Sequence, residues 1–219
     1  MFQTVIFDLD GTLTDPAKGI TNSFKHALKS FGEQVPSYKE LCTFIGPPLK
    51  DTFKQRFNYD DEKTEEAVRR YREYFARKGL FENKVYKEIP EVLEVLNMLG
   101  KKCYVATSKP EAYSVRILDH FGLAKYFKRI CGCNLDESRS NKEEVLAYTL
   151  DAAKISDDEK PTVLMVGDRK HDILGAKKNG IQSCGVLYGY GSKDELEKAG
   201  ADYIAKNVSE ILKIAITTF

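Results

Sequence analysis

The stretch from Val5 to Thr12 constrains the fold of this chain more than any other. An apolar run ends at two aspartates one residue apart, Asp8 and Asp10, and a glycine and a threonine follow at once. This pattern predicts a buried strand that ends at a turn. Strand alternation places both carboxylates on the same side of the strand. Ligands of open α/β sheets bind beyond the carboxyl ends of the strands, so we expect chemistry at this turn.

Two like charges this close repel, so the pair needs a cation, a shared proton or both. A second acidic pair follows the apolar run 162–166, where Gly167 precedes Asp168 and Asp172 lies one helical turn later. Paired carboxylates at this spacing suit a hard divalent cation. A loop with an N-capping aspartate is the alternative interpretation.

Hydroxyl and amine groups mark two further positions. Thr107 and Ser108 end an apolar run where a helix is expected to begin, and such a place favours an anion such as phosphate. Simple helix capping is the alternative. Lys142 lies at a helix start, where the helix dipole disfavours positive charge. Its side chain either points into solvent or has a role that requires a positive charge at this position.

From residue 86 onward, apolar runs and helical periods alternate. The expected helices are 90–99, 111–121, 141–153, 170–179 and one at the C-terminus, and the expected strands are 102–107, 129–132, 162–166, 182–186 and a short one near 203–204. Strands that alternate with helices imply a parallel sheet covered on both faces. The expected fold class is therefore α/β, a Rossmann-like doubly wound parallel sheet.

Helical periods without a convincing strand fill the region between the first strand and residue 86. A long helical block cannot be an ordinary crossover between neighbouring strands, because such connections are short. We therefore expect an inserted α-helical cap domain at 15–82 and a core domain at 1–14 and 83–219. The cap includes a charged helix from about residue 61 to 78.

Composition limits the partners and the location. The 219 residues are 42% hydrophobic, and 34 Lys and Arg against 33 Asp and Glu give a net charge of +1, so no bulk field attracts nucleic acid or an anionic membrane. No signal peptide or spanning segment is recognisable, which predicts a cytoplasmic protein. The five cysteines show no C-x-x-C spacing, and we expect them to be reduced and packed in the core.

Four stretches together resemble the motifs of the haloacid dehalogenase superfamily of phosphohydrolases, in particular its capped, phosphoglycolate phosphatase-like members. They are Asp-Leu-Asp-Gly-Thr-Leu-Thr from Asp8, Thr-Ser-Lys-Pro from Thr107, the lysine at 142, and Gly-Asp-x-x-x-Asp from Gly167. The resemblance implies that Asp8 is a nucleophile and Asp10 an acid/base. It implies phosphate binding by Thr107, by the N–H of Ser108 and by Lys142.

The same resemblance implies a Mg²⁺ ion and a reaction. Its ligands would be Asp8, the backbone carbonyl of Asp10, Asp168, and Asp172 as a ligand or as support for the lysine. The implied activity is hydrolysis of a small phosphate monoester, phosphoglycolate-like or nucleotide-like, through a covalent aspartyl-phosphate. The expected partner is thus a small phosphorylated metabolite, with no nucleic acid and no membrane, and the protein is expected to be a monomer or a homodimer.

The cap is expected to act as a lid that reads the leaving group. Its loop 44–49 begins with Phe44, Ile45 and Gly46, and Gly46 and two prolines favour a fixed loop shape. A tight turn between cap helices is the alternative.

Three other functions stay open. A phosphomutase of the same superfamily would share all four motifs. A non-enzymatic phospho-receiver also combines aspartates, Mg²⁺ and a lysine, but the order of motifs and the helical insertion argue against it. A binding protein on this fold is possible in principle, since fold does not fix function.

Overall fold

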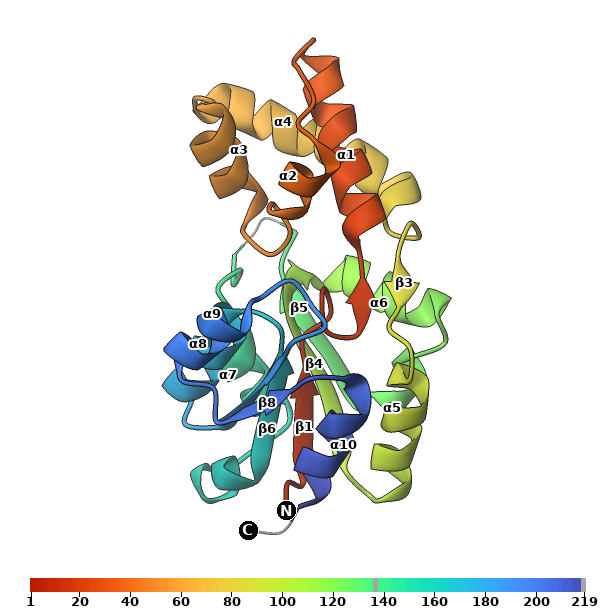
Figure 1. Ribbon diagram of the computed structural model, residues 1–219, viewed down its shortest axis with the longest axis vertical. Coiled ribbons are helices and arrows are strands. Elements are labelled where there is room, and N and C mark those ends of the chain that lie inside the picture. Colours follow the sequence, from red (N-terminus) through yellow and green to blue (C-terminus); the bar gives the residue numbers. More distant parts are fainter. Residues whose placement is uncertain (136–137, 218–219) are drawn as a thin grey trace. The chain divides into compact units, whose positions relative to one another are not determined.

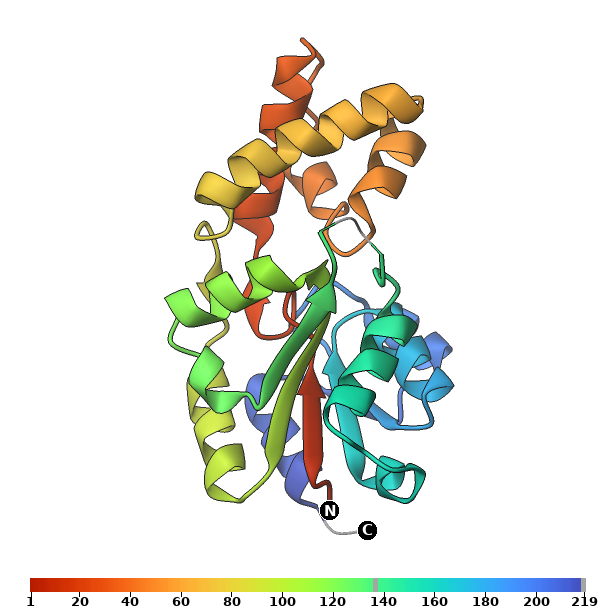
Figure 2. The ribbon, with the colours of Figure 1, turned by 180° about the vertical axis from the view of Figure 1, so that it is seen from behind.

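The structure, a computed structural model, describes residues 1–135 and 138–217. The chain divides into two compact units. One consists of Met1–Thr14 and Val85–Phe219, and we call it the α/β unit; the other is Asp15–Lys84, the helical unit. Figures 1 and 2 show the elements of both from opposite sides.

Six parallel strands of the described residues form the sheet of the α/β unit, in the order β5-β4-β1-β6-β7-β8. They are β1 (Thr4–Phe7), β4 (Lys102–Pro110), β5 (Arg129–Cys133), β6 (Val163–Gly167), β7 (Gln182–Val186) and β8 (Tyr203–Ala205). One face carries α5 (Ile89–Met98), α6 (Glu111–His120) and α10 (Val208–Ile216), and the other carries α7 (Lys142–Ala152), α8 (Lys170–Lys178) and α9 (Lys193–Ala199) (Figures 1 and 2). The prediction of a doubly wound α/β fold is confirmed.

The central strand β1 lies at the point where the direction of winding reverses. It pairs with β4 on one side and β6 on the other, with Phe7 opposite both Val105 and Val166. From β1 the chain winds outward through β4 to β5, and then returns to β6 and winds outward to β8. In sheets of this kind the ligand crevice lies at this reversal, beyond the carboxyl ends of the strands. The topology therefore directs attention to the residues that follow β1, β4 and β6.

Apolar packing fixes α7 and α8 against the sheet. Residues of three strands contact residues of both helices in one buried cluster, which contains Ile6, Tyr104, Ala106, Val145, Leu146, Leu150, Val163, Met165, Ala176 and Ile181. The five cysteines are free thiols, and all but the half-buried Cys42 are buried. Among the described residues, none of the helices is both long and apolar enough to cross a bilayer.

Several boundaries differ from those expected. Strand β4 runs on to Pro110, with a change of register between Thr107 and Pro110. Two strands of two residues each, β2 (Thr14–Asp15) and β3 (Lys84–Val85), pair with each other at the ends of the insertion. Two residues are too few to show strand alternation, so the sequence did not reveal them.

An aromatic cluster forms the core of the helical unit. The unit consists of α1 (Ala17–Ser30), α2 (Tyr38–Cys42), α3 (Leu49–Phe57), α4 (Asp61–Tyr74) and a π-helical turn, η1 (Phe75–Gly79). The ring of Phe24 in α1 lies 5.2 Å from Phe44, 5.3 Å from Phe53 and 5.0 Å from Tyr71, measured between centroids. The charged helix expected at 61–78 is α4, which ends at Tyr74, four residues early, where η1 begins.

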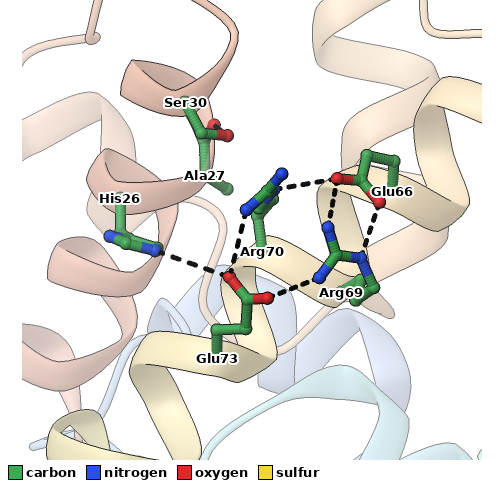
Figure 3. A network of polar contacts seen from close by, with 7 residues as sticks. All are labelled: His26, Ala27, Ser30, Glu66, Arg69, Arg70 and Glu73. Atoms are coloured by element: carbon green, nitrogen blue, oxygen red, sulfur yellow. Dashed lines mark hydrogen bonds and ion pairs between the residues drawn. The ribbon is translucent and has the colours of Figure 1, made fainter.

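A charged network covers the other face of α4 (Figure 3). Arg69 and Arg70 both pair with Glu66 and Glu73, and His26 of α1 lies 4.0 Å from Glu73. These side chains are substantially exposed, and exposed ion pairs contribute little to stability. The buried aromatic rings therefore hold the helical unit together.

Replacing Phe24 with alanine should loosen the helical unit selectively. The substitution opens a cavity in the aromatic cluster, and such changes cost about 3 kcal/mol. We expect faster amide hydrogen exchange in α1 and α4, with exchange in β1 and β6 unchanged. Tyr38→Ala, at an exposed ring, is the control. Equal acceleration in both units would show that the units do not unfold separately.

Candidate active site

Asp8 and Asp10 lie in a tight turn that directly follows β1. The N–H of Asp8 donates to the carbonyl of Val166 and so continues the ladder to β6, and the carbonyl of Leu9 accepts from the N–H groups of Leu13 and Thr14. Gly11 has φ +85°, and a Cβ on it would lie 2.2 Å from Oδ2 of Asp168. Only glycine therefore allows the turn to approach the end of β6 this closely.

Lys142 joins the two acidic pairs. The side chain of Asn141 caps α7 by accepting from the N–H of Glu143, and the helix then begins at Lys142. The Nζ of Lys142 lies 2.7 Å from Oδ1 of Asp8, 2.8 Å from Oδ1 of Asp172 and 2.9 Å from the carbonyl oxygen of Ala106. The buried ammonium thus has three oxygen partners, which explains a lysine at a position that the helix dipole disfavours.

Asp168 lies in the loop directly after β6, and Asp172 lies in the first turn of α8. Oδ2 of Asp168 accepts from the N–H of Tyr190 at 2.7 Å, and Oδ2 of Asp172 accepts from the N–H of Arg169 at 3.0 Å. A Cβ on Gly167 would lie 2.2 Å from Cγ of Asp172, so this glycine makes room for the second carboxylate. One oxygen of Asp8, one of Asp168 and one of Asp172 all lie within 4.8 Å of one another.

Burial and mutual repulsion change how these carboxyls titrate. Burial, together with Asp172 and Asp8, raises the pKa of Asp168 well above its ordinary value. Burial also raises the pKa of Asp172 to about 6, against the lowering effect of Lys142. The pKa of Lys142 is raised, because the carboxylates of Asp172 and Asp8 outweigh the burial that would lower it. The site thus holds more negative charge than its lysine balances.

The donor set fits a hard divalent cation. Three carboxylates converge, and Oδ1 of Asp168 is buried without a hydrogen-bond partner among the described residues. A buried acceptor without a donor is costly, and a cation would satisfy it. Asp8, Asp168 and Asp172 could hold such an ion together. The side chain of Asp10 is outside this group.

Lys109 is a site residue to which sequence reasoning assigned no role, although it lies in the Thr-Ser-Lys-Pro stretch. Its Nζ lies 2.6 Å from Oδ2 and 2.8 Å from Oδ1 of Asp10, and both side chains are largely buried. Burial raises the pKa of Asp10, although Lys109 lowers it. The available signal was a lysine two residues after Thr107, at the end of a strand that borders β1. Its partner could not be inferred, because it is the irregular end of β4 that brings Lys109 to the turn.

Thr107 and Ser108 lie at the end of β4, which neighbours β1 and the turn that carries Asp8 and Asp10. Thr107 is buried, its Oγ1 accepts from the N–H of Lys109 at 3.3 Å, and Ser108 is half-buried. The structure thus brings together residues at the carboxyl ends of β1, β4 and β6 and in the first turns of α7 and α8: Asp8, Asp10, Thr107, Ser108, Lys142, Asp168 and Asp172.

The three cap residues lie in the helical unit. The ring of Phe44 packs against Phe24 and Phe57, and Ile45 is also buried. Gly46 is exposed, with φ +108°. Phe44 therefore belongs to the aromatic core of its own unit, and a role for this loop in reading a leaving group stays a prediction.

Replacing Lys142 with methionine should destabilise the protein in a pH-dependent way. A carboxyl whose pKa is raised in the folded state favours folding below its ordinary pKa, and that contribution is lost as the pH rises through the folded value. Without the ammonium the pKa of Asp172 rises above about 6. The loss of stability should therefore be about 3 kcal/mol near pH 8 and smaller near pH 5.

Urea denaturation in a chelating buffer at the two pH values measures this difference. Lys170→Met is the control, because Lys170 is an exposed lysine near the same site. A stability loss that is equal at both pH values would show that Lys142 does not balance these carboxylates.

Comparison with known proteins identifies the family of this chain. The sequence model of the haloacid dehalogenase-like hydrolases matches residues 5–186. A crystal structure of a proposed phosphatase from Clostridium difficile superposes with a TM-score of 0.90 at 52% identity, covering 98% of this chain and 99% of that one.

Two curated relatives carry different names. A 5'-nucleotidase of Pseudomonas aeruginosa is 46% identical, over 89% of this chain and 87% of its own length. The tyrosine-protein kinase PtkA of Mycobacterium tuberculosis is 39% identical, over 92% of this chain and 68% of its own length. With its carboxylates at the strand ends and a family match over most of its length, this chain belongs to the haloacid dehalogenase-like hydrolases, as a phosphatase.

Proposed function

We propose that the chain hydrolyses a phosphate monoester of a small metabolite with the help of Mg²⁺, through an aspartyl-phosphate on Asp8. One observation carries this proposal. Asp8 is fixed by the buried ammonium of Lys142, beside two further carboxylates that suit a cation. Asp8, Asp168 and Asp172 would hold Mg²⁺, which would offset the negative charge of the carboxylates and of the substrate.

In the first step, Asp8 acts as the nucleophile. An oxygen of its carboxylate bonds to phosphorus while the bond from phosphorus to the ester oxygen breaks, and Asp10 gives its proton to the departing alkoxide. A raised pKa suits Asp10 to this task, because a leaving-group acid must be protonated near neutral pH. Lys142 holds the nucleophile in place.

In the second step, the roles of Asp10 reverse. Its carboxylate takes a proton from a water molecule, the water oxygen bonds to phosphorus, and the bond from phosphorus to Asp8 breaks. Inorganic phosphate leaves and both carboxyl groups return to their starting forms. Thr107 and the N–H of Ser108 would bind phosphate oxygens at the end of β4.

The relatives suggest where to look for the substrate. The similarity to a 5'-nucleotidase makes 5'-nucleotides the first compounds to test, with phosphoglycolate and sugar phosphates beside them. The similarity to a tyrosine-protein kinase supports a second candidate, phosphoryl transfer to a protein tyrosine. A phosphomutase would move phosphate within a substrate and release none. Measured phosphate release separates hydrolysis from both.

Asp8→Asn should abolish phosphate release by the protein. An amide is not a competent nucleophile, so we expect kcat to fall on the order of a thousandfold or more. The assay detects phosphate from the panel of compounds, with Mg²⁺ and with a chelator. Asp151→Asn, at an exposed carboxylate of the same unit, is the matched control. Substantial Mg²⁺-dependent turnover by Asp8→Asn would refute the covalent mechanism.

Asp10→Asn should discriminate between leaving groups. An alkyl phosphate needs a proton donor, whereas an aryl phosphate needs little help. We expect formation of the phosphoenzyme to slow about a hundredfold or more for the alkyl substrate and much less for the aryl one. Rapid-quench detection of labelled protein measures both rates. Equal losses for both substrates would argue against Asp10 as the leaving-group acid.

A further inference from the structure

The loop after β7 contacts both Asp168 and the turn after β1 that carries Asp8 and Asp10. This loop, Tyr188–Gly191, leads toward α9 (Figure 1). It contains none of the residues used in the mechanism above. Its start is anchored, since the N–H of Leu187 donates to the carbonyl of Ala205 at 2.9 Å. Beyond that anchor, the loop contacts the backbone and side chain of Asp168, the turn after β1 and the ring of Tyr86.

Two glycines let the loop lie directly against Asp168. A Cβ on Gly189 would lie 2.4 Å from Cβ of Asp168 and 2.4 Å from the carbonyl oxygen of Gly11. A Cβ on Gly191 would lie 1.9 Å from the carbonyl oxygen of Asp168. Real Cβ contacts are never this short, so any larger residue must displace the loop or the carboxylate.

One polar contact orients the carboxylate. The N–H of Tyr190 donates to Oδ2 of Asp168 at 2.7 Å, whereas Oδ1 stays buried without a hydrogen-bond partner among the described residues. A donor on one oxygen fixes the rotation of the carboxylate and keeps the other oxygen for a cation. Groups that orient metal ligands in this way commonly change metal affinity when they are altered.

A second polar contact fixes the opposite half of the site. The O–H of Tyr188 donates to the carbonyl of Thr12 at 2.9 Å, in the turn that carries Asp8 and Asp10. The ring of Tyr188 packs edge-on against Tyr86, with centroids 4.9 Å apart. The N–H of Tyr86 in turn donates to the carbonyl of Leu13 at 3.1 Å. The phenol is therefore held from two sides.

We propose that the loop Tyr188–Gly191 positions the turn after β1 and Asp168 relative to each other, and so sets the affinity of the site for its divalent cation. Tyr188, Gly189 and Gly191 are positioning residues, because they act through Asp168 and the turn. The inference rests on the proposed metal site, but its test measures metal binding without turnover.

The test is a titration of the full-length protein with Mn²⁺, followed by electron paramagnetic resonance of the free ion, with Mg²⁺ as competitor. Asp168→Asn should abolish the competed binding. Tyr188→Phe removes one hydroxyl, and we expect the dissociation constant to rise about fivefold. Gly189→Ala should raise it about tenfold or more. Wild-type protein that binds no Mn²⁺ at this site would overturn the proposal.

Two matched controls separate positioning from general loss of stability. Tyr203→Phe also removes a bonded hydroxyl, since Tyr203 donates to Gln182 in the same sheet. Gly185→Ala adds a methyl group to β7 that would lie 2.8 Å from the side chain of Leu196 and not against Asp168. Both should leave Mn²⁺ affinity unchanged, although Gly185→Ala should lower the unfolding free energy in urea.

Three results decide the question. Weaker Mn²⁺ binding in Tyr188→Phe with unchanged controls supports the proposal, even where Gly189→Ala fails to fold. Wild-type affinity in Tyr188→Phe overturns it, as does equal weakening in the controls. Because turnover is not measured, a protein that binds Mn²⁺ as expected yet releases no phosphate would contradict the proposed function alone.

Discussion

The balance of buried charge at the ends of β1 and β6 is the constraint on which the rest of the site depends. Four carboxylates, Asp8, Asp10, Asp168 and Asp172, meet two ammonium groups, Lys109 and Lys142. Fully ionised, this set carries two negative charges more than positive ones, which is the charge of one divalent cation. Without that cation, burial and mutual repulsion favour the protonated carboxyls, which raises the pKa values of Asp168 and Asp172.

The carboxylates can lie this close together only where glycines leave room for them. Gly11 and Gly167 each occupy a place where a Cβ would lie 2.2 Å from an atom of Asp168 or Asp172. Gly189 does the same from a loop far along the chain. Glycines at these positions thus leave the space in which the carboxylates come together. Their repulsion is then offset by lysines from two other elements, β4 and α7.

The sequence predicted the elements whose signals are local. Apolar runs that stop at Asp8, Thr107 and Asp168 indicated three strand ends, and helical periods indicated the insertion. It could not predict contacts that depend on distant pairing. Lys109 meets Asp10 from 99 positions away, at a place where β4 continues irregularly past its expected end. The role of the loop Tyr188–Gly191 could not be predicted either, because its partners lie in the turn after β1 and directly after β6.

The helical unit shows the same limit. Periodicity indicated one charged helix from residue 61 to 78, but the chain changes to a π-helical turn at Phe75. There, a Cβ on Gly19 would lie 2.0 Å from the carbonyl oxygen of Gly79, so the two backbones touch. A tertiary contact between α1 and η1 coincides with the change, and no local pattern encodes it.

The two aspartates of the first turn have different surroundings, which suit them to the different tasks that we propose for them. Asp8 accepts a hydrogen bond from a lysine that Asp172 and the carbonyl of Ala106 also hold, so its carboxylate is fixed in one orientation. The pKa of Asp10 is raised by burial, although Lys109 lowers it. A fixed carboxylate suits a nucleophile, and a carboxyl of raised pKa suits a proton donor. The division of labour that we propose thus follows from which lysine each aspartate meets.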